Sequence, residues 1–233
     1  MKDSSNGSED YNEGFARLYD MLSHKDYAGE VECLERLVLS DRCVSKDKII
    51  SVGCGTGIHE ILLAEHGFEV LGVDISNDMI EQAKSKLSVH NGSLRCKFEN
   101  KEISNCNEDG FSVAISLFNV INCLDDIQAL CQFFAEIEEK LNEGGTLVFE
   151  CWSGLACIID PPKFVKREFD TLNFTRTASP TLDAINQKLV IDYSIHGDED
   201  KWDAIESKHR LTLFSNMEIK FALDKAGFDL INI

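Results

Sequence analysis

The stretch Lys48-Ile-Ile-Ser-Val-Gly-Cys-Gly-Thr-Gly-Ile-His59, followed by Val70-Leu-Gly-Val-Asp74, decides the fold of this chain. The apolar run at its start predicts a strand that is buried on both faces. The three glycines after it allow a tight turn whose backbone N–H groups can approach a ligand where a Cβ would intrude. Asp74 ends the next predicted strand, where its carboxylate can accept hydrogen bonds from both hydroxyls of a ribose. The two stretches therefore predict a nucleoside cofactor at the carboxyl edge of a parallel sheet.

Two classes of nucleoside cofactor are compatible with a glycine turn of this kind. The nicotinamide fingerprint requires a third glycine three residues after Gly55, and the β-branched Ile58 occupies that position. The spacing Gly-x-Gly-x-Gly, with Asp74 ending the next strand, resembles motif I of class I S-adenosylmethionine (AdoMet) methyltransferases. In that family the glycine turn lies under the methionine part of AdoMet and the acid binds the ribose. The resemblance implies AdoMet as the cofactor.

The composition of the chain limits its possible partners. Its 23 Lys and Arg against 41 Asp and Glu give a net charge of −18, which repels a polyanion at long range. We therefore expect no nucleic-acid partner, whereas a single nucleotide sugar stays compatible with a local basic pocket. A chain of 233 residues is long enough for one α/β domain with a full core. We expect a monomer or a homodimer that acts on a small molecule.

The sequence also bears on the cellular compartment in which the protein is expected. No apolar run is long enough to span a membrane, and the polar N-terminus is unlike a signal peptide. The 9 cysteines are typical of a reducing compartment, and no Cys/His cluster has zinc spacing. We therefore expect a cytoplasmic protein without a membrane segment or a metal site.

Apolar periodicity divides the chain into a tail and a single domain. Residues 1–10 read as disordered, and residues 11–45 as a helical cap with apolar spacing at Tyr11–Leu22 and Val31–Val38. Strands and helices then alternate through an AdoMet-binding core at residues 46–152, which predicts a parallel sheet. The predicted strands are 48–53, 69–74, 94–99, 111–118 and 146–152, and the predicted helices are 57–66, 76–89 and 126–141.

The pattern changes after Trp152. Residues 153–214 contain three stretches of period 2, at 172–177, 188–195 and 208–214, and predict an antiparallel insert on the substrate side. Residues 215–233 then supply the last helix, ending at Gly227, and a strand. The fold class is thus α/β: a Rossmann-like methyltransferase sheet with helices on both faces and an antiparallel β region after the fifth strand. The further antiparallel strand that the family normally adds cannot be placed.

Several stretches resemble one branch of the superfamily, the N,N-dimethyltransferases that act on amino groups of nucleotide-linked deoxysugars. The similarity extends over nearly the whole chain from about residue 11, and the second half of it bears on the substrate. The resemblance implies methyl transfer from AdoMet to such an amino group. It is carried by Leu18-Tyr-Asp20, Lys25-Asp-Tyr27, Val52–Gly57, Gly72–Met79, Ser116–Leu124, Phe149-Glu-Cys-Trp152 and His209–Phe214.

The resemblance assigns a role to individual side chains. Glu99 matches the acid that contacts the adenine side in the family, and Asn100 beside it is a second candidate. The amine is expected to approach the methyl group where the fourth strand ends, next to Phe118. The residues implied in cofactor binding are Tyr19, Gly53, Cys54, Gly55, Thr56, Gly57, Asp74, Ile75, Met79, Glu99, Asn100 and Leu117.

The acceptor side departs from the family pattern. Related sugar enzymes often have His or Tyr at the position of Cys123, and other relatives have His at that of Asn119. Positioning of a neutral amine can contribute on the order of 7–11 kcal/mol, more than a typical general base. We nominate Asn119, Glu150 and His209 to orient the amine and take its proton. The substrate-binding candidates are Tyr27, Asn122, Cys123, Trp152 and Arg176.

Two other interpretations stay open at this point. One is N- or O-methylation of another small metabolite, such as an amino acid. The other is a catalytically silent AdoMet-binding protein, favoured by the absent last strand and the replaced His or Tyr. The intact glycine turn and Asp74 oppose the silent protein, since a domain without a cofactor has no physical need of them.

Overall fold

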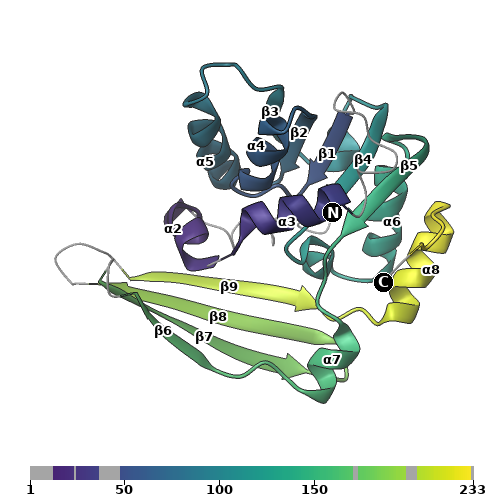
Figure 1. The fold of residues 1–233 in the computed structure, drawn as a ribbon. Helices are drawn as coiled ribbons and strands as arrows, with labels where there is room; N and C mark the ends of the chain where they lie inside the picture. Colours follow the sequence, from purple (N-terminus) through teal and green to yellow (C-terminus); the bar gives the residue numbers. More distant parts are fainter. Residues whose placement is uncertain (1–12, 24, 37–47, 170–172, 198–203, 232–233) are drawn as a thin grey trace.

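The computed structural model of the chain describes residues 13–23, 25–36, 48–169, 173–197 and 204–231. The expectations for residues 1–10, for Tyr11 and for 37–45 lie outside these ranges. Figure 1 shows a parallel sheet with helices on both faces, and below it a separate antiparallel sheet. No helix in the described residues is both long and apolar enough to cross a membrane.

The parallel sheet has five strands in the order β3-β2-β1-β4-β5. All neighbouring pairs run parallel, as the alternation of strands and helices predicted. The order reverses between β1 and β4, and in open α/β sheets the ligand lies in the crevice outside the carboxyl ends at this point. The strands are β1 (Lys48–Val52), β2 (Glu69–Asp74), β3 (Cys96–Asn100), β4 (Phe111–Ser116) and β5 (Leu141–Phe149).

Helices cover both faces of this sheet because its central strands are apolar on both. Successive side chains of a strand point to opposite faces, so Ile49 packs in the cluster under α3 (Tyr27–Leu34), α4 (Ile58–Glu65) and α5 (Asn77–Ser88). Ile50 packs in the opposite cluster, with α6 (Ile127–Glu138) and α8 (Asn216–Ala226). These two cores fix the glycine turn between β1 and α4.

The helix ends follow the capping residues of the sequence. Ser76 caps α5 by accepting a hydrogen bond from the backbone N–H of Met79 at 3.3 Å. Ser215 and Glu218 form a capping box at the start of α8. Gly227 ends α8 in the left-handed conformation, as predicted, and Phe228 then packs against the core of α6 and α8.

The antiparallel sheet is confirmed, and it has four strands where the sequence predicted three stretches. Its order is β6-β7-β8-β9, and the short helix α7 (Gly154–Ile159) precedes it. The sequence missed the first strand because four of its five residues are exposed and carry no apolar alternation. The strands are β6 (Val165–Phe169), β7 (Phe174–Asp183), β8 (Lys188–Gly197) and β9 (Ile205–Thr212).

Helix α2 (Glu13–Ser23) lies between the two sheets (Figure 1). Its apolar face, with Phe15, Leu18 and Leu22, shares a core with Met79 of α5 and with aromatic and aliphatic side chains of the antiparallel sheet. The helical cap thus packs on the cofactor half and on the insert at once.

Several element boundaries differ from the predictions, and three of the differences have a physical reason in the structure. Helix α6 ends at Glu138 and β5 begins at Leu141, because the segment 142–145 is a bulge: Phe111 pairs with Leu141 and Val113 with Thr146. Strand β4 ends at Ser116, since the chain turns at Phe118. Residues 228–231 form no strand: Phe228 packs on the helical core, and residues 229–231 are exposed and do not pair with β5.

Candidate cofactor and acceptor site

The glycine turn between β1 and α4 has a backbone that only glycine adopts without strain. Gly55 and Gly57 have φ angles of +55° and +78°. A Cβ on Gly57 would lie 2.5 Å from the Phe98 ring, so this glycine is required for packing. A Cβ on Gly55 would meet nothing within 4 Å and would enter open space. The turn therefore has one glycine that serves the fold and one that keeps a space clear.

Asp74 is held in a fixed orientation at the end of β2. Its Oδ2 accepts from the backbone N–H of Gly55 at 2.8 Å and its Oδ1 from that of Ser76 at 2.8 Å. Each carboxylate oxygen keeps a lone pair for a further donor. Burial raises the pKa of Asp74, and the hydrogen bonds from Ser76 and Gly55 partly oppose that shift. The geometry suits a carboxylate that accepts from two adjacent hydroxyls.

A cavity opens beside the turn. Eight residues nominated from the sequence line it: Tyr19, Tyr27, Gly53, Cys54, Gly55, Thr56, Gly57 and Leu117. The structure adds Ser51, Ile58, His59, Glu60 and Phe118 to its lining.

The cap is attached to the glycine turn through polar contacts. The Thr56 hydroxyl donates a short hydrogen bond to Asp20 of α2. Lys86 of α5 donates to the Thr56 carbonyl at 2.9 Å and pairs with Asp20 at 2.5 Å. Tyr19, one residue before Asp20, is thereby placed at the cavity, with its ring 6.4 Å from that of Phe118.

The other cofactor nominees lie around Asp74. The Asn100 amide donates to the carbonyls of Asp74 and Ile75, each at 2.9 Å, and so fixes the loop after β2. The Ile75 side chain is exposed beside it, as a contact for a base would require. Glu99 pairs with Lys101 at 2.7 Å, and Met79 is buried in the core under α2. The roles of these four residues stay predictions.

The backbone is strained where β4 ends. Phe118 and Asn119 both have positive φ angles, +62° and +63°, which are uncommon for residues other than glycine. Such strain clusters at functional sites. The Asn119 Oδ1 is buried, and it has no hydrogen-bond partner among the described residues. A buried acceptor without a donor thus lies beside the cavity-lining Phe118.

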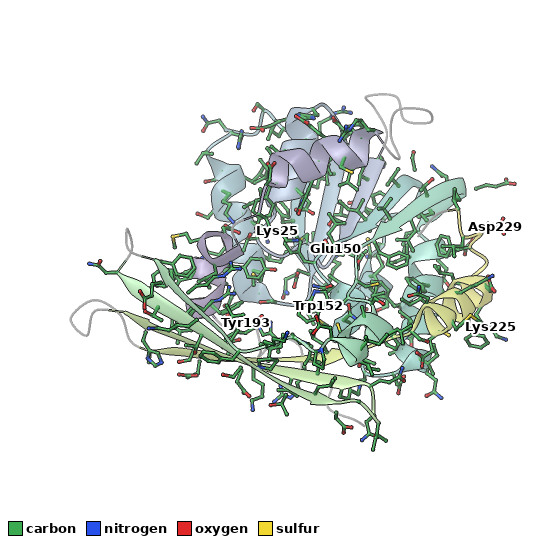
Figure 2. All side chains as sticks on the ribbon, turned by 60° about the horizontal axis from the view of Figure 1, so that its bottom comes forward. Lys25, Glu150, Trp152, Tyr193, Lys225 and Asp229 are labelled. Carbon is green, nitrogen blue, oxygen red and sulfur yellow. The ribbon has the colours of Figure 1, made fainter. Side chains whose placement is uncertain are left out.

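A chain of charges crosses from the cap to the end of β5. The Lys25 ammonium lies 3.0 Å from the centroid of the Phe118 ring and 3.6 Å from a carboxylate oxygen of both Glu30 and Glu150. Glu30 in turn pairs with the buried His59 at 2.8 Å. Figure 2 shows Lys25 and Glu150 close together where the parallel-sheet half faces the antiparallel sheet.

The acceptor candidates Asn122, Cys123 and Trp152 have local partners. Asn122 is buried, donates to the Thr212 carbonyl at 2.8 Å and accepts from the Trp152 backbone N–H at 3.0 Å. Its amide therefore joins the segment after β4 to the segment after β5 and to β9. Trp152 packs on the apolar cluster of the antiparallel sheet, and Cys123 is exposed.

Arg176 and His209 lie on the antiparallel sheet near α2. Arg176 of β7 donates to the Leu22 carbonyl at 3.2 Å, and its guanidinium lies 5.3 Å from the Tyr193 ring centroid. Burial lowers the Arg176 pKa. The His209 ring lies 5.0 Å from that of Phe15 and 4.8 Å from that of Tyr193. Neither side chain belongs to the described lining of the cavity.

Sequence reasoning missed the charged side chains that meet at the cavity. Glu60 and His59 stand in the first turn of α4, where a helix packed on a sheet needs apolar residues, and both are buried. Charged residues on the buried face of a predicted helix were the available signal. For Lys25 and Glu30 the sequence contains no such signal, because their contacts with Glu150 and His59 depend on how the cap packs on the core.

The residues present fit a nucleoside with a further group that extends along the glycine turn. Asp74 offers oriented acceptors for a diol, and Gly55 leaves room for a ligand along the turn. This arrangement on a five-stranded sheet of order β3-β2-β1-β4-β5 defines the Rossmann-like fold of the class I methyltransferases.

Comparison with known proteins identifies the family. The family model described as a methyltransferase domain matches residues 44–203, and the chain belongs to that family. It is a class I methyltransferase and its cofactor is AdoMet.

Relatives and solved structures agree with the family. The Bacillus subtilis protein YqeM, named as a candidate methyltransferase, is 26% identical over 94% of this chain and 86% of its own. The dTDP-3-amino-3,4,6-trideoxy-alpha-D-glucopyranose N,N-dimethyltransferase of Streptomyces venezuelae is 26% identical over 93% and 91%. The AdoMet-bound amino pentose methyltransferase CalS10 of Micromonospora echinaspora is 20% identical, over 90% and 88%, with a TM-score of 0.72.

Proposed function

We propose that the protein transfers the methyl group of AdoMet to the amino group of a nucleotide-linked deoxysugar. The observation that carries the proposal is the Lys25 ammonium on the face of Phe118, between the carboxylates of Glu30 and Glu150. An aromatic face with two carboxylates is a favourable environment for a protonated alkylamine, which has to lose a proton before it can react. The name of the 26% identical relative from Streptomyces venezuelae points to the same kind of acceptor.

The hydrogen-bonding groups at the end of β4 and β5 also favour an amine. The Glu150 carboxylate and the Asn119 Oδ1 are both acceptors, and an amine offers more N–H donors to them than a hydroxyl does. AdoMet would supply a methyl group on a positively charged sulfur, and the deprotonated amine would take this group as the S–C bond breaks and S-adenosylhomocysteine leaves. Asn119 would orient the amine, and Glu150 would take its proton. From the antiparallel sheet, His209 would help to orient the amine and take its proton, and Arg176 would bind the acceptor.

The experiment is a screen of acceptors by mass spectrometry, with AdoMet present throughout. Nucleotide amino sugars, free amines and hydroxylated metabolites are compared for the gain of one or more methyl groups. We expect the gain on nucleotide amino sugars. Methylation of hydroxylated metabolites alone would overturn the proposal, and so would AdoMet binding without methylation of any acceptor.

A pair of variants tests the role of Glu150. Glu150→Gln removes the proton acceptor and is expected to lower kcat by about 100-fold and to shift the pH profile of the rate. Glu143→Gln makes the same change at an exposed position of β5 and should leave the rate unchanged. Equal rates for the two variants would exclude Glu150 from the reaction.

A further inference from the structure

Glu60 is a buried acid whose burial its neighbours compensate only in part. It stands in the first turn of α4 with only 2% of its surface exposed. The Ser51 hydroxyl donates to its carboxyl group, but Oε2 has no hydrogen-bond partner among the described residues. Burial raises the Glu60 pKa, and the nearby His59 opposes that shift. An uncompensated carboxyl group in this position costs folding free energy.

The rest of α4 indicates what the fold alone would select. Of the other four buried positions of the helix, Ile61, Leu63 and Ala64 are apolar, and the fourth, His59, has Glu30 as a partner. An apolar residue in place of Glu60 would avoid the cost of burying the acid. An acid that is retained against its own burial, in the lining of a cavity, is characteristic of a binding site.

The ligand of this cavity has a charge that Glu60 can neutralise. Asp74 accounts for the ribose of AdoMet, and the glycine turn leads from Asp74 to the cavity that Glu60 lines. The amino-acid tail of AdoMet ends in an ammonium and a carboxylate. Glu60 is the only carboxylate among the described lining residues, so it is the group that an ammonium there would meet.

We propose that Glu60 binds the α-ammonium group of AdoMet and thereby selects ligands that carry the amino-acid tail. The unpartnered Oε2 accepts an N–H of the ammonium, while Ser51 holds the carboxyl group in place. The approach of a positive charge reverses the effect of burial, so Glu60 is ionised in the complex. This inference rests on the assignment of AdoMet as cofactor and is independent of the methyl acceptor.

The test compares two ligands by calorimetry. S-adenosylhomocysteine carries the amino-acid tail, and 5′-methylthioadenosine lacks it. Glu60→Gln is expected to weaken the binding of S-adenosylhomocysteine by about 10- to 100-fold and to leave the affinity for 5′-methylthioadenosine unchanged. Glu65→Gln, at an exposed position of the same helix, should change neither affinity. An equal loss for both ligands, or no loss for S-adenosylhomocysteine, would overturn the assignment.

Two further measurements keep the test independent of how the variant folds. The unaltered protein should bind S-adenosylhomocysteine at least about 10-fold more tightly than its analogue without the α-amino group, and equal affinities would contradict the proposal. Glu60→Leu should melt at the same temperature as the unaltered protein or higher, because it removes a buried acid. If the unaltered protein bound neither S-adenosylhomocysteine nor AdoMet, the cofactor assignment itself would fail.

Discussion

The glycine turn and the acceptor side differ in how their functional groups are brought together. In the turn, Gly55 is bonded to Asp74 across two adjacent strands, and the backbone provides most of the geometry. On the acceptor side, Lys25 from the cap meets Glu150 from the end of β5 and Phe118 from the end of β4. The first site is set by local chain geometry, and the second exists only when the cap is packed on the core. Substitutions should therefore act differently in the two regions.

The largest effect is expected within the glycine turn itself. Gly57→Ala forces a Cβ against the Phe98 ring at a positive φ and should lower the free energy of unfolding by about 3 kcal/mol. Gly55→Ala places its Cβ in open space and should lower it by only about 1 kcal/mol, while blocking AdoMet binding. Urea unfolding and calorimetry measure the two quantities. Equal losses of stability would show that packing does not distinguish the two glycines.

The next effect concerns the carboxylate at the end of β2. Asp74→Ala removes the charged acceptor of the ribose hydroxyls and should raise the dissociation constant of AdoMet by about 100-fold. Asp78→Ala, in the first turn of α5, is the matched control and should change it little. An unchanged dissociation constant in Asp74→Ala would show that Asp74 does not bind the ribose.

The pH dependence of AdoMet binding sharpens the same assignment. Burial raises the pKa of Asp74, so its carboxylate takes up a proton at a higher pH than an ordinary aspartate. The ionised form binds the ribose, and affinity should therefore fall as pH decreases through this raised pKa. Calorimetry across about pH 4–7 measures the fall. Measuring it in the Glu60→Gln variant isolates the contribution of Asp74. In the double variant Glu60→Gln, Asp74→Asn, the pH dependence of affinity should disappear.

The smallest effect tests how the cap is attached to the core. Glu30 pairs with the buried His59, whereas Glu35 pairs with the half-exposed His66 at the C-terminal ends of the same two helices. Glu30→Ala should lower the free energy of unfolding by about 1–2 kcal/mol, because it leaves His59 without this partner. Glu35→Ala should cost less than about 0.5 kcal/mol. Thermal melting compares them, and equal losses would mean that burial of the pair does not matter.

The sequence was informative where function depends on the backbone. The glycine spacing and the apolar residues of β1 predicted the turn and the buried strand before it, because each depends on neighbours in the chain. The same reasoning missed β6, whose exposed residues carry no apolar alternation, and it ended α6 too late because a bulge in β5 resembles a helix stop.

What the sequence by itself determined is the parallel α/β core and the nucleoside site at the glycine turn, since their signals lie in short stretches around Gly55 and Asp74. The tertiary structure decided which charges meet. Lys25, Glu30 and Glu150 come together through the packing of the cap, and Glu60 is buried because α4 lies against the sheet. The strength of a charge interaction depends on distance and burial, and neither quantity can be read from the order of residues alone.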